Sequence, residues 1–219
     1  MSLPAVHQSA ALLLGYPDHT WPARLRTVAD SLTQLSGPGT GPLRSFCAAV
    51  RDTPPMALAE HYILTFDRSR RRTLYLTYYT DGDTRRRGGS LAEWKARYRA
   101  HGWETPPDDL PDHLPLALEF AARCPEPGTA LLQEHRAALE LLRMALTDHG
   151  TPYADVLRGV CDTLPGPAPA DRAAALRLAR SGPPVELVGL PPFAAPAPAT
   201  SIPTPTAAPN GRRTEEAGR

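Results

Sequence analysis

The stretch LYLTYYTDGDTRRRGG, residues 74–89, decides the fold class, because it is the part of the chain that looks least like a helix. Its first half has the aromatic and β-branched residues typical of a strand, and DGD could form a hairpin turn. No second strand follows, since the next residues are arginines, glycines and the start of a helix. A lone strand would leave its backbone groups unpaired. We therefore predict helix here, followed by a loop over residues 81–89.

Helical periodicity recurs through most of the remaining chain, with apolar residues spaced by three and four so that they share one helix face. The segments with this pattern are 21–35, 43–50, 56–65, 90–98, 112–122, 132–146 and 151–164. Two starts are predicted in detail, a capping box from Ser90 and Glu93 and an N-cap with first turn from Thr151 and Pro152. The helix near residue 112 is expected to begin at Asp112 or His113. Short loops and the lack of alternating strands indicate an all-α fold, a compact single-domain bundle of about seven helices.

The composition changes after residue 165, which suggests three parts. Residues 1–165 are predicted to form the helical domain. Residues 166–193 contain a proline-rich linker, a short helix capped by Asp171 and the apolar segment VELVGLPPF, which could dock on the domain. Residues 194–219 form a Pro/Ala-rich C-terminal tail with too few apolar side chains to offset the entropy of ordering, so we predict disorder there.

The overall charge argues against binding to nucleic acid or membranes through net charge alone. The chain has 24 basic and 23 acidic residues and a formal charge of +1, so no net field attracts it to a phosphate backbone or an anionic membrane. Cys47, Cys124 and Cys161 are odd in number and far apart, which argues against a disulfide framework and a zinc ribbon. No segment approaches the ~18 consecutive apolar residues of a membrane helix, and no signal peptide is recognisable. We expect a soluble cytoplasmic protein.

Two arginine clusters, at residues 68–72 and 85–87, keep nucleic-acid binding open as an alternative. Together with the interleaved tyrosines they could contact phosphates and stack on bases, although no helix-turn-helix or RNA-binding signature accompanies them. His113 beside Asp112 is the best metal candidate, yet the spacing of a zinc motif is missing. No nucleophile elbow, phosphate-binding glycine loop or dinucleotide fingerprint occurs, so we predict no metal site and no enzymatic activity.

Three motifs between residues 62 and 122 form a specific set. TFD followed by arginines, then LYLTYYTDGDTRRRG, then DLPDHLPLALEF occur in this order and at fitting spacing. The set resembles the NarJ family, the assembly chaperones of respiratory nitrate reductase. The resemblance extends more loosely over residues 5–165 and over GPPVELVGLPPF.

This resemblance implies a compact helical chaperone of the wider redox-enzyme maturation class. Its members bind the N-terminal segment of the apo catalytic, or alpha, subunit of nitrate reductase in the cytoplasm. They keep this client competent for insertion of a molybdopterin guanine dinucleotide cofactor and delay membrane docking until then. The expected partners are therefore the nitrate reductase alpha subunit and, as further candidates, molybdenum cofactor biosynthesis proteins, with no cofactor held permanently. A related molybdoenzyme is an alternative client.

The same motifs supply candidate client-binding residues. The client segment is basic and partly apolar, so a groove with aromatic surface and carboxylates would suit it. The candidates are three tyrosines for apolar contact, four acids for client arginines, and two further motif residues: Tyr75, Tyr78, Tyr79, Asp81, Asp83, Asp112, Glu119, Arg85 and His113. The glycines are expected to let the loop move. A structural role is the alternative for each residue; Asp112, for example, could cap the helix that it begins.

Overall fold

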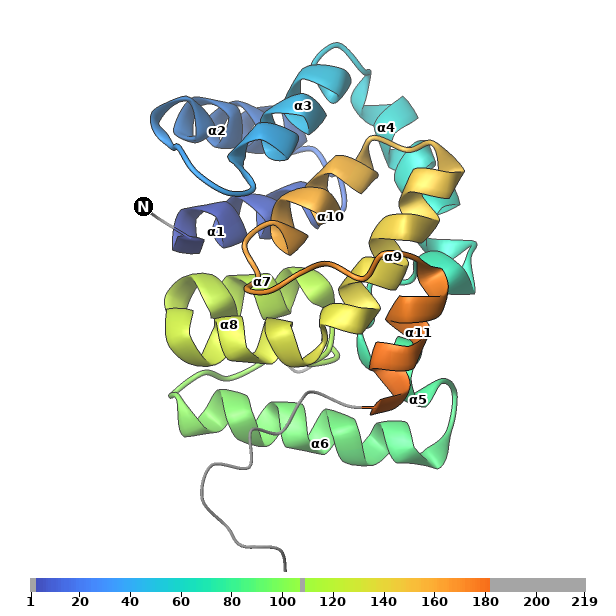
Figure 1. The fold of residues 1–219 in the computed structure, drawn as a ribbon. Coiled ribbons are helices and arrows are strands. Elements are labelled where there is room, and N and C mark those ends of the chain that lie inside the picture. Colours follow the sequence, from blue (N-terminus) through green and yellow to red (C-terminus); the bar gives the residue numbers. More distant parts are fainter. Residues whose placement is uncertain (1–2, 107–108, 182–219) are drawn as a thin grey trace, which may run out of the picture. The chain divides into compact units, whose positions relative to one another are not determined.

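The computed structural model describes residues 3–106 and 109–181, and within these ranges the chain is helical almost throughout (Figure 1). The α-helices are α1 (Leu3–Leu14), α2 (Trp21–Gln34), α3 (Thr40–Val50), α4 (Pro55–Tyr62), α5 (Thr77–Asp81), α6 (Arg85–Ala100), α7 (Leu114–Arg123), α8 (Pro125–Glu134), α9 (Arg136–His149), α10 (Tyr153–Cys161) and α11 (Arg172–Ser181). A π-helical turn, η1 (Ile63–Asp67), continues α4, and a 3₁₀ turn, η2 (Arg70–Arg72), follows it. The all-α prediction is confirmed.

The core is built around α1, which packs along α7 and also contacts α10 and α2. Figure 1 shows α1, α7 and α10 between the α2–α3 pair and α6. Small residues allow the helices to approach closely, since Ala10 of α1 and Ala117 and Ala121 of α7 have no exposed surface. The contact between α7 and α8 is closer still: a Cβ atom on Gly128 would lie 2.2 Å from the Cα atom of Ala121. Packing at this density fixes the framework on which the loops are held.

The structure divides the chain into more helices than the periodicity predicted. The segment 132–146, expected as one helix, breaks at His135, whose φ of −100° and ψ of 17° are not helical. The ring of His135 stabilises the break, because Trp94 Nε1 donates to its Nε2 at 3.3 Å while its Nδ1 bonds the carbonyl of Leu131 at 3.0 Å. The helix α1 was not anticipated from its short apolar run.

The predicted loop over residues 81–89 is wrong. The connection covers only residues 82–84, where Gly82 has a φ of 62° and ends α5, and α6 begins at Arg85. Gly88 and Gly89 are therefore helical and do not form a mobile loop. The predicted capping box is also wrong, because Ser90 lies inside α6 and its Oγ donates to Asp81 Oδ2 at 2.6 Å.

The strand-like segment before α5 forms β-type backbone pairing at one residue. Tyr75 pairs with His113 in an isolated antiparallel bridge, closed by Leu76 N donating to Asp112 O at 3.0 Å and Leu114 N donating to Leu74 O at 2.8 Å. No longer strand forms in residues 3–106 and 109–181. The bridge ties the segment before α5 to the segment before α7.

The remaining predicted boundaries agree closely with the structure or lie outside it. The helix near residue 112 begins at Leu114 with His113 as N-cap, and α10 begins at Tyr153, one residue later than expected. Asp171 caps α11 as predicted, since its Oδ1 accepts from Ala174 N at 2.7 Å. The helix α11 packs on α9, and the helices α1 to α11 belong to one compact unit. The predicted docking segment 185–193 and the predicted disordered tail 194–219 lie outside the described residues.

Candidate functional site

A half-open pocket of about 320 Å³ lies where η1 and η2 meet the start of α5 and the residue that caps α7. We call it the aromatic pocket. Its lining consists of Tyr62, Phe66, Asp67, Ser69, Arg70, Thr73, Leu74, Tyr75, Tyr78 and His113. Three of the predicted site residues, Tyr75, Tyr78 and His113, are therefore brought together, and all three sequence motifs contribute to the lining.

The floor of the aromatic pocket is rigid because it continues into the core. The rings of Tyr62 and Phe66 lie 4.8 Å apart, and the ring of Phe66 lies 4.9 Å from that of Tyr153. The hydroxyl of Tyr62 donates to the carbonyl of Leu14 at 3.0 Å, which anchors the floor to the end of α1. Burial accordingly raises the pKa of Tyr62, so the phenol stays protonated. The floor therefore offers an uncharged, largely apolar surface.

Tyr75 and His113 form one wall. They face each other across the antiparallel bridge as a pair without hydrogen bonds between them, the arrangement that brings side chains closest. Their rings lie 5.3 Å apart, and the Arg87 guanidinium lies 5.6 Å from the centroid of the Tyr75 ring. Tyr75 keeps 36% of its surface exposed. Burial lowers the pKa of His113, so the imidazole is neutral at physiological pH and can donate or accept.

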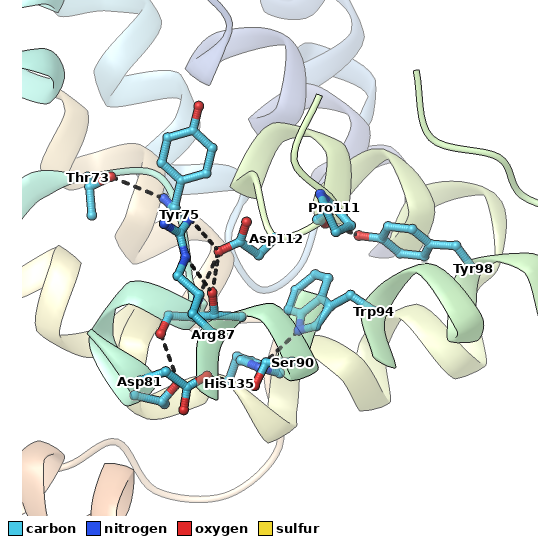
Figure 2. A network of polar contacts seen from close by, with 12 residues as sticks. Thr73, Tyr75, Asp81, Arg87, Ser90, Trp94, Tyr98, Pro111, Asp112 and His135 are labelled. Carbon is cyan, nitrogen blue, oxygen red and sulfur yellow. Dashed lines mark hydrogen bonds and ion pairs between the residues drawn. The ribbon is translucent and has the colours of Figure 1, made fainter. Parts of the chain in front are cut away.

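Asp112 lies behind this wall with no exposed surface (Figure 2). Its Oδ2 accepts from Thr77 N at 3.2 Å, from Thr77 Oγ1 at 2.6 Å and from Arg87 Nη2 at 3.4 Å. Arg87 Nε also donates to Thr77 Oγ1 at 3.2 Å. The carboxylate therefore joins α5, α6 and the start of α7, and a client in solution does not reach it in this conformation.

The other predicted residues lie around the pocket and outside its lining. The side chain of Asp81 is only 6% exposed and binds Ser90, with Arg86 at 3.7 Å. Tyr79 faces inward, its hydroxyl lying within hydrogen-bonding reach of the Thr73 carbonyl at 3.0 Å and the Arg71 carbonyl at 3.1 Å. Two further candidates, Asp83 and Arg85, are exposed at the α5–α6 turn. Glu119, on α7, pairs with Arg123 at 3.3 Å.

Seven lining residues were not predicted as site residues from the sequence: Tyr62, Phe66, Asp67, Ser69, Arg70, Thr73 and Leu74. Phe66 and Asp67 belong to the TFD motif, which was noted but not assigned to the site. The π-helical turn that turns this motif toward Tyr75 has no signature in the sequence. Asp67 and Arg70 are exposed at the rim, and neither makes a salt bridge with any described residue.

Several arginines of the two clusters make hydrogen bonds or ion pairs within the protein. Arg72 Nε donates to the carbonyl of Thr65 at 2.9 Å, which holds η1 and η2 together. Arg87 is bound to Asp112, and Arg86 lies near Asp81. Within the described part of the chain no group of three or more histidines, cysteines or acids is placed to hold a metal ion. No helix found there has both the length and the apolar character needed to cross a membrane.

These features define an all-helical protein with a pocket built from aromatic side chains on a rigid floor. The chain belongs to the nitrate reductase delta subunit family, the NarJ family, whose model matches residues 31–158. It is 33% identical over 150 residues to the probable nitrate reductase molybdenum cofactor assembly chaperone NarJ of Bacillus subtilis, covering 66% of this chain and 80% of that protein. It is 34% identical over 101 residues to NarJ of Escherichia coli K12, covering 46% of this chain and 43% of that protein.

A further relative is much longer than this chain. The nitrate reductase-like protein NarX of Mycobacterium tuberculosis H37Rv is 39% identical over 159 residues, which are 72% of this chain. The match spans 24% of NarX, about a quarter of its length. The shared region is therefore a unit that occurs both as most of a protein, as in Bacillus subtilis NarJ, and as a part of a larger one.

Proposed function

We propose that this protein is an assembly chaperone that binds the apo catalytic subunit of a respiratory nitrate reductase in the cytoplasm. Membership of the family and the chaperone names of the Bacillus subtilis and Escherichia coli relatives support this proposal. The chaperone keeps the client competent for insertion of its molybdopterin guanine dinucleotide cofactor and delays membrane docking. The cofactor is cargo for the client, delivered by its biosynthesis proteins, and we assign the chaperone no catalytic role.

The aromatic pocket is the observation that supports our choice of the client-binding site. Its floor and wall present Phe66, Tyr75 and Tyr78 to an apolar side chain, and its rim presents Asp67, which makes no salt bridge with any described residue. A segment that is basic and partly apolar finds both kinds of contact there, since a cation can pair with the carboxylate and lie over a tyrosine ring. We therefore place the N-terminal segment of the client in the aromatic pocket.

The acids have separate roles in this proposal. Asp81 accepts from Ser90, and Asp112 accepts through Oδ2 from Thr77 and Arg87, so both brace the wall from behind. Within the described residues, Asp112 Oδ1 is buried without a hydrogen-bond partner. Asp67 pairs with the client. Among the remaining predicted residues, exposed Asp83 and Arg85 lie at the α5–α6 turn and can contact a longer segment outside the pocket.

Calorimetric titration with a synthetic peptide of the client's first residues tests the proposal. We expect saturable one-site binding, weakened about tenfold by Tyr75→Ala, which removes a half-exposed aromatic contact. Asp67→Asn is expected to weaken binding about threefold, the effect of one exposed ion pair, and to reduce its salt dependence. Circular dichroism spectra identical to those of the original protein would show that both variants are folded.

Asp52→Asn is the matched control, because Asp52 is an exposed acid outside the pocket lining and makes no salt bridge with any described residue. It should leave the affinity unchanged. An absence of heat with peptide, together with no binding of the full-length apo catalytic subunit, would overturn the chaperone proposal. Peptide binding that Tyr75→Ala and Asp67→Asn leave unaltered would remove the client from the aromatic pocket.

A further inference from the structure

A second cavity, of about 430 Å³, lies between α9, α10 and the segment that leads from α10 toward α11. We call it the arginine cavity. Its lining consists of Arg136, Glu140, Arg143, Arg158, Cys161, Asp162, Leu164, Gly166 and Ala168. It shares no lining residue with the aromatic pocket, and neither the family nor the proposed function assigns it a role.

Two oppositely charged side chains are buried at the base of this cavity. Glu140 has no exposed surface, and its Oε2 accepts from Arg143 Nε at 2.7 Å. Arg136 is almost fully buried, donates from Nη1 to the carbonyl of Pro165, and has its Nη2 3.9 Å from Glu140 Oε1. Within the described residues, Arg136 Nε and Glu140 Oε1 are left buried with no hydrogen-bond partner. A buried polar atom without a hydrogen-bond partner lowers the stability of the fold, unless a water molecule or a ligand forms the missing hydrogen bond.

The mouth of the cavity offers further unused donors. Arg143 uses only its Nε for Glu140, and its side chain is 24% exposed. Arg158 has one ion pair, to Asp155 at 3.4 Å, and its side chain is 53% exposed. Two guanidinium groups thus keep N–H donors available at the opening. Guanidinium forks match the geometry of phosphate oxygens better than any other side chain does.

The charge balance of the lining leaves room for an anion. Three arginines line the cavity against two acids, Glu140 and Asp162. Glu140 is occupied by its arginine neighbours at the base. The volume is also within the range of small-ligand sites, which span roughly 300–1,000 Å³.

We propose that the arginine cavity binds a phosphate-bearing small molecule of mononucleotide size. Its phosphate group lies at the mouth, between the guanidinium groups of Arg143 and Arg158. The body of the ligand extends toward the base, where an acceptor meets Arg136 Nε and a donor meets Glu140 Oε1, the two atoms that the fold leaves unsatisfied. This site is independent of client binding in the aromatic pocket.

Titration calorimetry on the full chain, at constant ionic strength set with sodium chloride, tests the proposal with inorganic phosphate, pyrophosphate, AMP and GMP. We expect saturable binding by at least one probe. Arg158→Gln and Arg143→Gln should each weaken it about tenfold or more, since a charge-assisted hydrogen bond is lost. Asp162→Asn should strengthen it, because one negative charge leaves the lining.

Arg97→Gln is the matched control, since Arg97 is a half-exposed arginine paired with Glu134 at 2.7 Å outside this cavity. It should leave binding unchanged. Tighter binding of a mononucleotide than of inorganic phosphate supports the proposal in full. Binding of free phosphate and pyrophosphate that the nucleotides do not improve supports only a phosphate subsite and overturns the mononucleotide-sized ligand. The whole proposal is overturned if no probe saturates, or if Arg158→Gln and Arg143→Gln bind as Arg97→Gln does.

Discussion

Asp112 illustrates, at the residue scale, how a side chain in a family motif can support a site without touching what the site binds. It lies in the DHLP part of the third motif and carries no exposed surface. Its carboxylate accepts hydrogen bonds from the backbone N–H and the hydroxyl of Thr77 and from the guanidinium of Arg87. Arg87 in turn lies against the ring of Tyr75, so the position of the pocket wall depends on an acid behind it.

We predict that Asp112→Ala lowers the free energy of unfolding by about 3 kcal/mol, because it strands a buried hydroxyl, an amide and part of a guanidinium without their acceptor. Urea denaturation followed by circular dichroism measures this loss. Asp83→Ala, at an exposed acid without a salt bridge among the described residues, should change the stability by less than about 0.5 kcal/mol. Equal stability of the two variants would contradict the bracing role of Asp112.

The two kinds of acid could not be separated from the sequence. Asp67, Asp81 and Asp112 all lie in the motifs that carry the family resemblance. Whether a carboxylate is buried against Thr77 or exposed at a rim depends on contacts between segments far apart in the chain. The aromatic residues were predicted only in part, since Tyr75, Tyr78 and His113 line the pocket, whereas the predicted Tyr79 does not, and Tyr62 and Phe66 were not predicted.

At the scale of elements, glycine positions distinguish tight helix contacts from open helix surface. Gly128 of α8 is buried against Ala121 of α7, and an added Cβ would lie 2.2 Å from a backbone atom. Gly88 and Gly89 are also helical, in α6, but a Cβ there would meet nothing within 4 Å. The same substitution should therefore have opposite effects at the two places.

Gly128→Ala is predicted to cost about 3 kcal/mol of stability, because α7 and α8 must move apart and the packing of α7 on α1 is strained. Gly88→Ala is predicted to add about 0.5–1 kcal/mol, the usual gain from replacing an unrestrained helical glycine. Chemical denaturation midpoints of the two variants give the comparison. A stable Gly128→Ala protein would mean that α7 and α8 are not in such close contact.

Elements with strong periodicity were predicted well, and those with special geometry were not. The helix α2 follows directly from apolar residues spaced by three and four and ends within one residue of its predicted limit. The break at His135 depends on a hydrogen bond from Trp94, which is 41 residues away in the chain. The early start of α6 at Arg85 likewise depends on Arg87 finding Asp112, an interaction that local pattern does not contain.

At the scale of the molecule, α9 connects the two sites within the compact unit. It contacts η2 and α5, which border the aromatic pocket, and also α10 and α11. Its residues Arg136, Glu140 and Arg143 line the arginine cavity. Periodicity predicted that a helix would occupy most of this region, but the charged residues on it gave no sign of being buried, because arginine and glutamate usually lie on the solvent face.

Burial of histidines is a second property of the molecule as a whole, and it makes stability depend on pH. Burial lowers the pKa of four of them: His7, His61, His113 and His135. The pKa of His7 is lowered from 6.5 to about 4. Its Nε2–H donates to Thr163 Oγ1 at 2.9 Å, because the hydroxyl of Thr163 itself donates to the Val160 carbonyl.

We predict that the protein loses stability as the pH falls from about 7 to about 5. In this range the unfolded chain takes up protons on histidines that the folded chain keeps neutral, so the stability present above a pH of about 6.5 declines toward the folded pKa values. His7 alone accounts for about 2 kcal/mol over this range. The pKa of Asp162 is raised by burial, so protonation of this one carboxyl on acidification favours the folded chain and opposes the effect of the histidines.

Urea denaturation at several pH values measures the slope of stability against pH. His7→Gln should flatten the slope, since glutamine keeps a donor for Thr163 but does not titrate. The slope, and not the stability at a single pH, is the decisive quantity, because His7→Gln also alters packing between α1 and the end of α10. Stability that stays constant or rises on acidification would show that these histidines are protonated within the fold.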